Sequence, residues 1–412
     1  MLLPPHRSPL LMALFSLSFL FTHSTTAEPL VAPCPTYSFS TVACMNKYGS
    51  VLPEDYDRST IPIVGFTDTY ASTQVPSDPS FAYISNASFL IYDTARAPSV
   101  LGPSPAVDFM FQIPLIGHEA PVYDPTTNRL FFSKLLGNET SQYTIDLSAT
   151  PPTLSTFTSH PPTLVPAGGT FHAGLVYWCG SATQSGTYIP GLYTLNTTTY
   201  ATTPLLNNYF GLRFTTCDDL AVHPVTSDVW FTDNYYAHNI PLLQRNNTPQ
   251  LPPAVWRFRP STGALQLVDD TLQQPNGIAF AADGRTAYVS DTSADTPLLS
   301  PAETVWTQMA RRTVYAFDID AGFGGVGRRR VLYRAQDRIP DGVKVARNGW
   351  VVAAAGHGVD VVDAGGTLVV RVQTNFTVLN LAWAGRDWED LWLVGVGGVA
   401  RVRWGLPGRE IV

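Results

Sequence analysis

The sequence predicts an all-β fold, a six-bladed β-propeller built from four-stranded blades. Three observations predict it. The composition is rich in Pro, Gly, Thr, Val and aromatic residues, while charged residues make up only 14% of the 412 residues, and this balance favours strands and turns over helices. One hairpin pattern recurs six times along the chain. An oxygen-bearing side chain stands ahead of four of these copies, at one position of the repeat.

The N-terminus predicts a secretory signal peptide over residues 1–27. Arg7 supplies a positive charge, Leu10–Phe21 forms an apolar run, and Thr25–Ala27 provides small residues for cleavage. This run is shorter than the roughly 20 apolar residues of a membrane span, which leaves a signal anchor as the alternative reading. No later stretch is long and apolar enough to span a membrane. We therefore expect a secreted, extracellular protein without membrane contact after signal cleavage.

Residues 28–100 form an N-terminal segment that precedes the propeller, which we place at residues 101–412. Within the segment, Ser88–Asp93 is available to add an outer strand to the last blade. The four cysteines fit an oxidising compartment and allow three pairings. Cys34 and Cys44 flank a short N-terminal stretch and are placed to close one small loop, and Cys179 and Cys217 are available for a second bridge. Neither pair has metal-site spacing with histidine, so both are interpreted as structural.

The charge of the chain narrows the class of partner, and sequons indicate glycosylation. The formal net charge of −7 disfavours nucleic acid, and no arginine- or lysine-rich stripe is present. We expect a small-molecule partner instead, and the sequence does not predict an oligomeric state. Glycosylation sequons, as expected of a secreted protein, stand at Asn86, Asn138, Asn196, Asn246 and Asn375.

Each copy of the repeat is a short apolar strand, a turn rich in Asp, Asn, Gly or Pro, and an aromatic or β-branched strand. Further strand pairs lie between copies, such as Thr313–Asp318 with Arg330–Tyr333, so each repeat holds about four strands, which is one blade. Closing six blades into a ring removes exposed sheet edges, and a β-sandwich, the alternative, predicts no repeat of this length. The first strands of the copies are Ala120–Tyr123, Gly169–Phe171, Leu220–His223, Ile278–Phe280, Val343–Val345 and Leu381–Trp383.

Aligning the copies places Glu119, Asp218, Asn276 and Asp341 at the start of four innermost strands. Such positions in different blades point toward the same place on the axis of a propeller. Carboxylates and an amide carbonyl are hard oxygen donors that suit Ca²⁺, with Mg²⁺ or Mn²⁺ as alternatives, and they disfavour Zn²⁺ except in a catalytic role. Crowded carboxylates also repel one another unless a cation lies between them. Singly, each Asp-Gly or Asn-Gly has a simpler role as a turn former.

Other polar residues near the proposed axis are weaker candidates. His118, Asp219 and His223 are placed near a substrate, although a lone histidine is usually a satisfied structural residue. Asp233 and Asp291 both end second strands, where a repeated structural turn explains them at least as well as chemistry. The sequence contains no Gly-x-Ser-x-Gly elbow, no Walker loop and no His-Glu-x-x-His.

These motifs resemble a known family. Pro275–Phe280, with Asp283-Gly284 and Tyr288–Asp291, resembles the gluconolactonase and senescence-marker-protein (regucalcin-like) family. His118–Tyr123, and Asn207–Leu212 ahead of Asp218, resemble its fungal lactonohydrolase branch. The likeness extends from about Pro114 to the C-terminus. Residues 28 to about 100 match no part of that family's pattern.

The resemblance implies a six-bladed propeller with calcium in its channel and hydrolysis of a lactone or a similar ester. Glu119, Asn276 and Asp341 fall where the family has metal ligands, and Asp341 falls where it has the residue that acts as general base. Asp218 falls where the family usually has the Asn of an Asn-Asp pair, which puts substrate contact, and so activity, in question. A non-catalytic binding module with a structural calcium, and a strictosidine-synthase-like or paraoxonase-like ester hydrolase, are the alternatives.

Overall fold

Antiparallel four-stranded sheets make up most of the structure, a computed structural model that describes residues 28–37, 41–46, 50–58, 69–135, 140–181, 189–239, 249–296, 305–320 and 324–409. The first blade contains β5 (Val122–Asp124), β6 (Arg129–Phe132), β7 (Ser141–Asp146) and β8 (Thr153–Thr158). The second contains β9 (Pro166–His172), β10 (Leu175–Gly180), β11 (Gly191–Leu195) and β12 (Thr202–Leu206). The third contains β15 (Leu220–Val222), β16 (Val229–Asp233), β17 (Ala254–Arg259) and β18 (Ala264–Asp269).

The remaining blades follow the same order from the axis outward. The fourth contains β19 (Pro275–Phe280), β20 (Thr286–Asp291), β23 (Thr313–Ile319) and β24 (Val326–Arg334). The last contains β29 (Thr377–Ala384), β30 (Asp390–Val396), β31 (Gly398–Arg403) and, from the other end of the chain, β4 (Ala106–Gln112). Between these two stands a larger sheet that contains β25 (Pro340–Val345), β26 (Val351–Ala355), β27 (Gly358–Val362) and β28 (Leu368–Gln373).

This larger sheet continues past β28 into the N-terminal segment. β3 (Phe89–Ile91) pairs antiparallel with β28, and β2 (Val42–Met45) and β1 (Val31–Pro33) follow, so that the sheet has seven strands. The prediction of six four-stranded blades is therefore wrong in its count, because five sheets are four-stranded blades and the remaining one is enlarged by the N-terminal segment. The all-β propeller fold is confirmed, as are all six predicted hairpins, which form the two innermost strands of each sheet.

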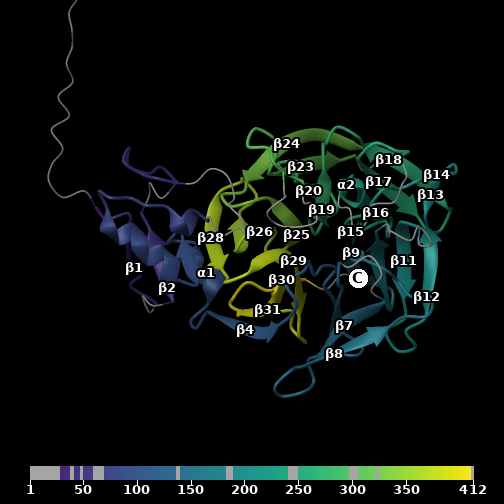
Figure 1. Cartoon of the computed structure of the whole chain (residues 1–412), viewed down its shortest axis with the longest axis horizontal. Helices are drawn as coiled ribbons and strands as arrows, with labels where there is room; N and C mark the ends of the chain where they lie inside the picture. Colours follow the sequence, from purple (N-terminus) through teal and green to yellow (C-terminus); the bar gives the residue numbers. More distant parts are fainter. Residues whose placement is uncertain are drawn as a thin grey trace, which may run out of the picture.

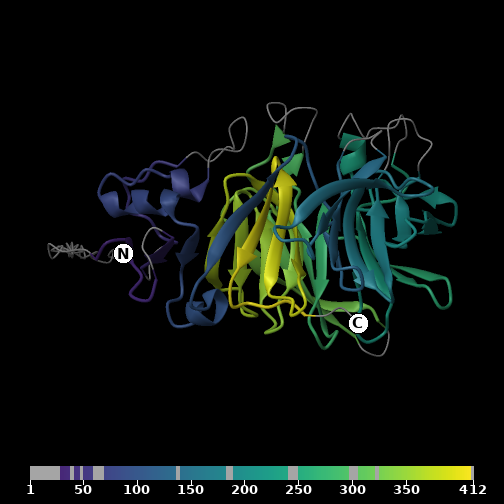
Figure 2. The ribbon, with the colours of Figure 1, turned by 90° about the horizontal axis from the view of Figure 1, so that it is seen from below.

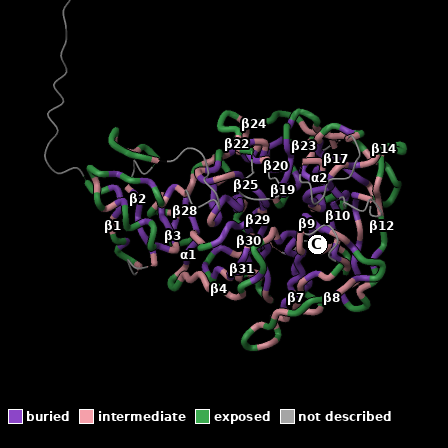
Figure 3. Tube along the Cα trace, in the orientation of Figure 1, coloured by how far each residue is buried: buried purple, intermediate pink, exposed green. Residues whose placement is uncertain are grey.

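The innermost strands close a ring around one axis. β5, β9, β15, β19, β25 and β29 each contact the next, and β29 contacts β5. Figure 1 shows this ring, with the N-terminal segment at one side. Hydrophobic clusters between neighbouring sheets hold the blades together, and Figure 3 shows burial concentrated on the inner strands while exposed residues follow the rim. Four tryptophans, Trp178, Trp230, Trp256 and Trp392, are among the largest fully buried side chains.

The N-terminal segment has a small core of its own and is placed beside the ring. Its core includes Phe81 and Ile84 on the 3₁₀-helix η2 (Pro79–Asn86), which packs near η1 (Tyr70–Ser72). The predicted strand Ser88–Asp93 does form, as β3, but not on the last blade, whose outer strand is β4. Next to β28, the apolar residues Phe89–Ile91 are buried on both faces of the strand. Phe89 and Ile91 pack into the core of the ring, and Leu90 packs into the core of the N-terminal segment.

The remaining elements are short. Both predicted disulfides form, Cys34–Cys44 in the N-terminal segment and Cys179–Cys217 between the second and third blades. No helix in the described ranges is long and apolar enough to cross a membrane. The predicted signal peptide and the sequons at Asn138 and Asn246 lie outside the described residues. The short elements are α1 (Ala97–Leu101), β13 (Asn208–Tyr209), β14 (Leu212–Arg213), α2 (Tyr236–Asn239), β21 (Asp295–Thr296) and β22 (Val305–Trp306).

Candidate functional site

The four predicted ligands stand at the starts of four inner strands. Glu119 precedes β5, Asp218 precedes β15, Asn276 is the second residue of β19, and Asp341 is the second residue of β25. All four are buried, with exposures between 4% and 7%. Because the inner strands form one ring, these side chains belong to one level of the channel. We call this level, with Asp219 and Asn380 added for the reasons below, the acidic layer.

Glycines between these residues let the inner strands approach closely. A Cβ atom on Gly277 would collide with the carbonyl oxygen of Asp341, and one on Gly342 would collide with the side chain and backbone of Asn380. The Asn-Gly and Asp-Gly pairs are thus required by packing between neighbouring sheets. They are not turn formers here, because both glycines lie within strands.

Electrostatics show that the carboxylates of the acidic layer act on one another. The pKa of Glu119 lies well above its ordinary value, first because of burial and then because of the charges of Asp341 and Asp218. The pKa of Asp218 is also raised, by burial and then by Asp341. Among the described residues, Oε2 of Glu119 has no hydrogen-bond partner although it is buried. A buried carboxylate oxygen without a donor, beside other carboxylates, is unfavourable unless a cation is supplied.

Asp218 gains an amide partner that the sequence did not reveal. Nδ2 of Asn234, just after β16, donates to Oδ2 of Asp218 and also to the carbonyl oxygen of Pro275 at 2.9 Å. Its own Oδ1 accepts from the backbone N–H of Tyr236, at the start of α2, at 3.1 Å. A carboxamide is therefore still present at this point of the channel, supplied by a different residue. The signal for it was Asn234 directly after the third hairpin's second strand.

Asp341 lies between an amide and a guanidinium. Burial raises the pKa of Asp341 to about 7, while the charge of Arg338 and a hydrogen bond from the Asn276 side chain oppose that rise. Arg338 is itself fixed by Asp295 on β21, whose Oδ2 accepts from its Nε at 2.8 Å. Arg338 and Asp295 were missed by sequence reasoning because neither occupies the repeat position used for the alignment.

Asp219 and Asn380 complete the layer. Oδ2 of Asp219 forms an ion pair with Nζ of Lys344 on β25 at 3.4 Å, and burial raises the pKa of Asp219 in spite of it. The side chain of Asn380 on β29 donates a hydrogen bond to Glu119. Asn380 also accepts from the backbone of the next residue, as Asp219 does, each at 2.8 Å. In the sequence, Asn380 directly precedes the first strand of its repeat, as Asp219 does, and this shared position is the signal that would have identified Asn380.

Asp233 and Asp291 have a structural role. Oδ1 of Asp233 accepts from the backbone N–H groups of Thr216 at 2.7 Å and Cys217 at 3.0 Å, just ahead of Asp218. Asp291 accepts from the N–H of Gln273 at 2.9 Å, ahead of Asn276. In both sheets the carboxylate at the end of the second strand holds the turn that presents an acidic-layer residue.

The two histidines differ from each other. In His223 both ring nitrogens are used, since Nε2 contacts the carbonyl oxygen of Gly284 at 2.9 Å and Nδ1 accepts from two backbone N–H groups at 3.2 Å. His223 is thereby a structural residue, and the prediction that it lies ready for a substrate is not supported by its contacts. His118 contacts two carbonyl oxygens through Nδ1, at 2.9 and 3.0 Å, and burial lowers its pKa to about 4. Its Nε2 is buried without a partner in the described structure.

The donors of the acidic layer fit a hard divalent cation. In the described ranges, His, Cys, Asp and Glu by themselves form no cluster of three arranged to hold a metal ion. The layer adds amide oxygens to its carboxylates, and the unpaired Oε2 of Glu119 together with the raised pKa values indicates a deficit of positive charge. Oxygen donors of this kind suit Ca²⁺ or Mg²⁺. Glu119, Asp218, Asn276 and Asp341 are the residues that would hold it.

Comparisons with known proteins agree with this fold. The sequence profile described as "SMP-30/Gluconolactonase/LRE-like region" matches residues 118–396, which include the whole acidic layer. Lactonohydrolase oryL of Aspergillus oryzae is 43% identical over 389 residues, covering 92% of this chain and 88% of that protein. Lactonohydrolase oryH of the same organism is 37% identical over 442 residues, covering 93% of this chain and 94% of that protein.

Solved structures share the fold at lower identity. A gluconolactonase from Xanthomonas campestris superposes with a TM-score of 0.62 at 23% identity, covering 77% of this chain and 94% of that one. The calcium-binding protein regucalcin from Agrobacterium tumefaciens superposes with a TM-score of 0.56 at 16% identity, covering 74% of this chain and 96% of that one. Both likenesses leave about a quarter of this chain unmatched.

Proposed function

The chain belongs to the SMP-30/gluconolactonase/LRE-like family, and from that premise we propose that it is a secreted, cation-dependent lactone hydrolase. The substrate is a sugar-derived or related lactone, and the cation, with Ca²⁺ as first choice, is held at the acidic layer. The observation that carries the proposal is the buried, unpaired Oε2 of Glu119 among carboxylates that raise one another's pKa. The lactonohydrolases oryL and oryH, and the calcium-binding regucalcin, support it by analogy.

A bound divalent cation would supply Lewis-acid polarisation of the lactone carbonyl. We assign the proton transfer to Asp341, because it occupies the position of the general base in the family that the sequence resembles. The oxygen of a water attacks the carbonyl carbon while Asp341 accepts the water's proton. The ring C–O bond then breaks, and the proton passes from Asp341 to the leaving ring oxygen. The product is the open hydroxy acid.

Neighbouring residues keep Asp341 in position for this role. The amide of Asn276 donates a hydrogen bond to its carboxylate, which fixes the orientation of that carboxylate. Arg338, clamped by Asp295, limits the rise in the pKa of Asp341 and so keeps part of it ionised near neutral pH. Asn234 and Asn380 hold the carboxylates of Asp218 and Glu119 toward the same level of the channel.

The test measures hydrolysis of a panel of aldonolactones and aliphatic lactones before and after chelation, with Ca²⁺, Mg²⁺, Mn²⁺ and Zn²⁺ added back singly. We expect chelation to abolish turnover and Ca²⁺ to restore it. Asp341→Asn is expected to lower kcat by roughly a hundredfold or more, as removal of a general base does. Asp318→Asn, on the exposed outer part of β23, is the matched control and should keep full activity.

Each outcome tests a different part of the proposal. Turnover that resists chelation would contradict the cation, whereas cation binding without turnover of any lactone would favour the non-catalytic binding module. Near-normal turnover by Asp341→Asn with the cation retained would assign water activation to the cation instead of to Asp341. Secretion is tested separately by mass spectrometry of the exported protein, for which we expect an N-terminus at Glu28 and glycans at the exposed Asn86 and Asn375.

A further inference from the structure

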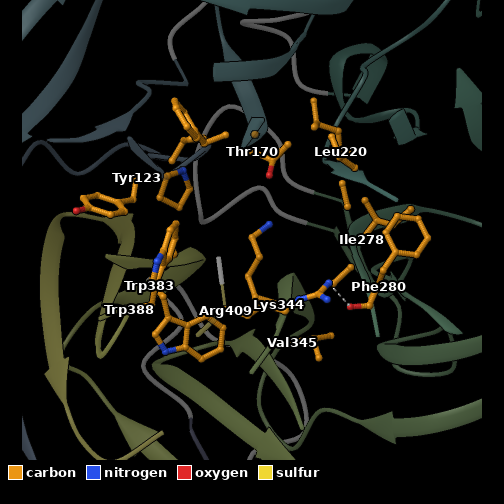
Figure 4. Close-up of a pocket in the computed structure, with 18 residues that line it drawn as sticks. Tyr123, Thr170, Leu220, Ile278, Phe280, Lys344, Val345, Trp383, Trp388 and Arg409 are labelled. Atoms are coloured by element: carbon orange, nitrogen blue, oxygen red, sulfur yellow. Dashed lines mark hydrogen bonds between the residues drawn. The ribbon is translucent and has the colours of Figure 1, made fainter. Parts of the chain in front are cut away.

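A cavity lies in the channel beyond the acidic layer. Its walls come from all six inner strands, downstream of the acidic-layer positions, so it occupies the part of the channel toward the other mouth. The cavity volume is about 80 Å³. Figure 4 shows the aromatic side chains of Tyr123, Phe280, Trp383 and Trp388 around it. These walls are apolar and are contributed by sheets on opposite sides of the ring.

The charge of this cavity is opposite to that of the protein. Lys344 and Arg409 line it, and no carboxylate is among its described lining residues. Lys344 is already paired with Asp219 of the acidic layer at 3.4 Å, so Arg409 is the cation whose charge no carboxylate balances among the described residues. Figure 4 shows the Lys344 ammonium extending into the space between the walls, with the Arg409 guanidinium beside Phe280. The arrangement is a cationic site with an aromatic lining.

Arg409 lacks a carboxylate partner among the described residues. One of its N–H groups donates to the carbonyl oxygen of Phe280 at 3.0 Å, and no ion pair to Arg409 forms within the described ranges. Burial lowers the pKa of Arg409, and the charge of Asp283 offsets this only in part. An anion in the cavity would supply the missing countercharge, and hydrogen bonds between ions are among the stronger ones in proteins.

Backbone contacts fix the segment that carries Arg409. The chain after β31 crosses the channel mouth, where the indole N–H of Trp383 donates to the carbonyl oxygen of Leu406 at 3.0 Å. The N–H of Gly408 donates to the carbonyl oxygen of Trp388 at 2.7 Å, and Nε of Arg347 donates to the carbonyl oxygen of Gly408 at 3.1 Å. In Figure 2 this end of the chain lies on the lower face of the propeller. Arg409 is therefore held in place before any ligand binds.

We propose that this cavity is a binding site for a small organic carboxylate with an aromatic or branched apolar body. The carboxylate lies between the Lys344 ammonium and the Arg409 guanidinium, and the apolar body packs against Trp383, Trp388 and Phe280. The site adjoins the acidic layer, since Lys344 also forms an ion pair with Asp219 of that layer, but none of the four predicted cation ligands lines the cavity. Ligand pockets commonly combine apolar walls with a few fixed polar groups in this way.

The experiment titrates benzoate into the full-length mature protein and follows tryptophan fluorescence and isothermal calorimetry. Benzamide, which has the same shape without the charge, and gluconate, which has the charge without an apolar body, are the comparison ligands. We expect saturable binding of benzoate, at least tenfold tighter than that of either comparison ligand. Arg409→Gln should weaken benzoate binding at least tenfold, and Arg409→Lys, which keeps the charge, should weaken it less.

Asp341→Asn, at the acidic layer, should leave benzoate affinity within twofold of the wild-type value. Thermal unfolding of each variant shows that it is folded, and Lys344→Met provides a second change at the cavity if Arg409→Gln does not fold. The proposal is overturned if benzoate does not bind saturably, if benzamide or gluconate binds as tightly, or if Asp341→Asn abolishes binding while Arg409→Gln and Lys344→Met leave it unchanged. That last result would place the carboxylate at the acidic layer.

Discussion

Asp341→Asn should stabilise the cation-free protein while it disables the cation site. The pKa of Asp341 rises from its ordinary value of 3.8 to about 7 on folding. Because the folded pKa is the higher one, the stability that the protonated carboxyl contributes is complete below pH 3.8 and is lost as the pH rises through about 7. At about 1.4 kcal/mol per pKa unit, the buried charge costs roughly 4 kcal/mol at pH 8. An amide in its place does not ionise and avoids this cost.

The assay is urea unfolding followed by tryptophan fluorescence, in chelator, at pH 4 and pH 8. We expect the Asn variant to exceed the wild type in free energy of unfolding by about 4 kcal/mol at pH 8 and by close to zero at pH 4. Added Ca²⁺ should narrow this difference at pH 8, since a ligand at a hundred times its Kd stabilises the folded state by about 2.7 kcal/mol. That gain should appear in the wild type and be reduced in the variant.

Two results would refute this reasoning. If the variant is no more stable than the wild type at pH 8 in chelator, the buried charge of Asp341 does not carry the cost that its raised pKa indicates. If its advantage is the same at pH 4 and pH 8, the gain comes from packing and not from charge. Asp318→Asn, whose side chain is 52% exposed, is the control and should shift neither value.

The remaining predictions concern what holds the site and the N-terminal segment in place. Arg371 is 1% exposed and bridges Asp360 at 2.7 Å and Asp337 at 2.6 Å, so Arg371→Met should cost about 3–5 kcal/mol, measured by urea unfolding, because it leaves buried carboxylates unpaired. Asp337 also accepts from the backbone N–H of Tyr70 at 2.6 Å, so the same variant should expose the N-terminal segment to limited proteolysis, and an unchanged digest would contradict this link. Replacing both cysteines of the Cys179–Cys217 bridge by serine should lower the free energy of unfolding by about 2–5 kcal/mol and weaken Ca²⁺ binding, because Cys217 directly precedes Asp218. Calcium affinity equal to that of the wild type would show that the bridge does not position Asp218.

Much of the fold could be predicted because a propeller repeats. The six hairpins and several outer strands were recognisable from the spacing of apolar and turn residues. The cysteines allowed three pairings, of which the structure forms Cys34–Cys44 with Cys179–Cys217. The assignment of Ser88–Asp93 to the last blade failed because a strand with apolar residues on both faces fits either of two neighbouring sheets. Only the paired register shows that it joins β28 and enlarges that sheet to seven strands.

In the candidate site too, the sequence identified some residues and only the structure revealed the others. Glu119, Asp218, Asn276 and Asp341 were identifiable because equivalent repeat positions must converge on the axis. Asn234, Arg338 and Asn380 were not, because they belong to other repeat positions and reach the layer through side-chain geometry. His223 shows the same limit of sequence reasoning. Its place in the repeat predicted a position near the axis, but in the structure both of its ring nitrogens contact backbone groups.

The sequence by itself determined a propeller with oxygen-bearing side chains at the starts of its inner strands, because each copy of a repeat places equivalent residues in equivalent positions. The tertiary structure decided the electrostatic balance of the channel. Lys344 and Arg409 lie 65 positions apart, and only the crossing of the last residues over the channel mouth brings both to one cavity. Likewise, the pKa values of the acidic layer depend on burial and on distances between blades. Spacing along the chain specifies neither of these, because they arise only when the ring closes.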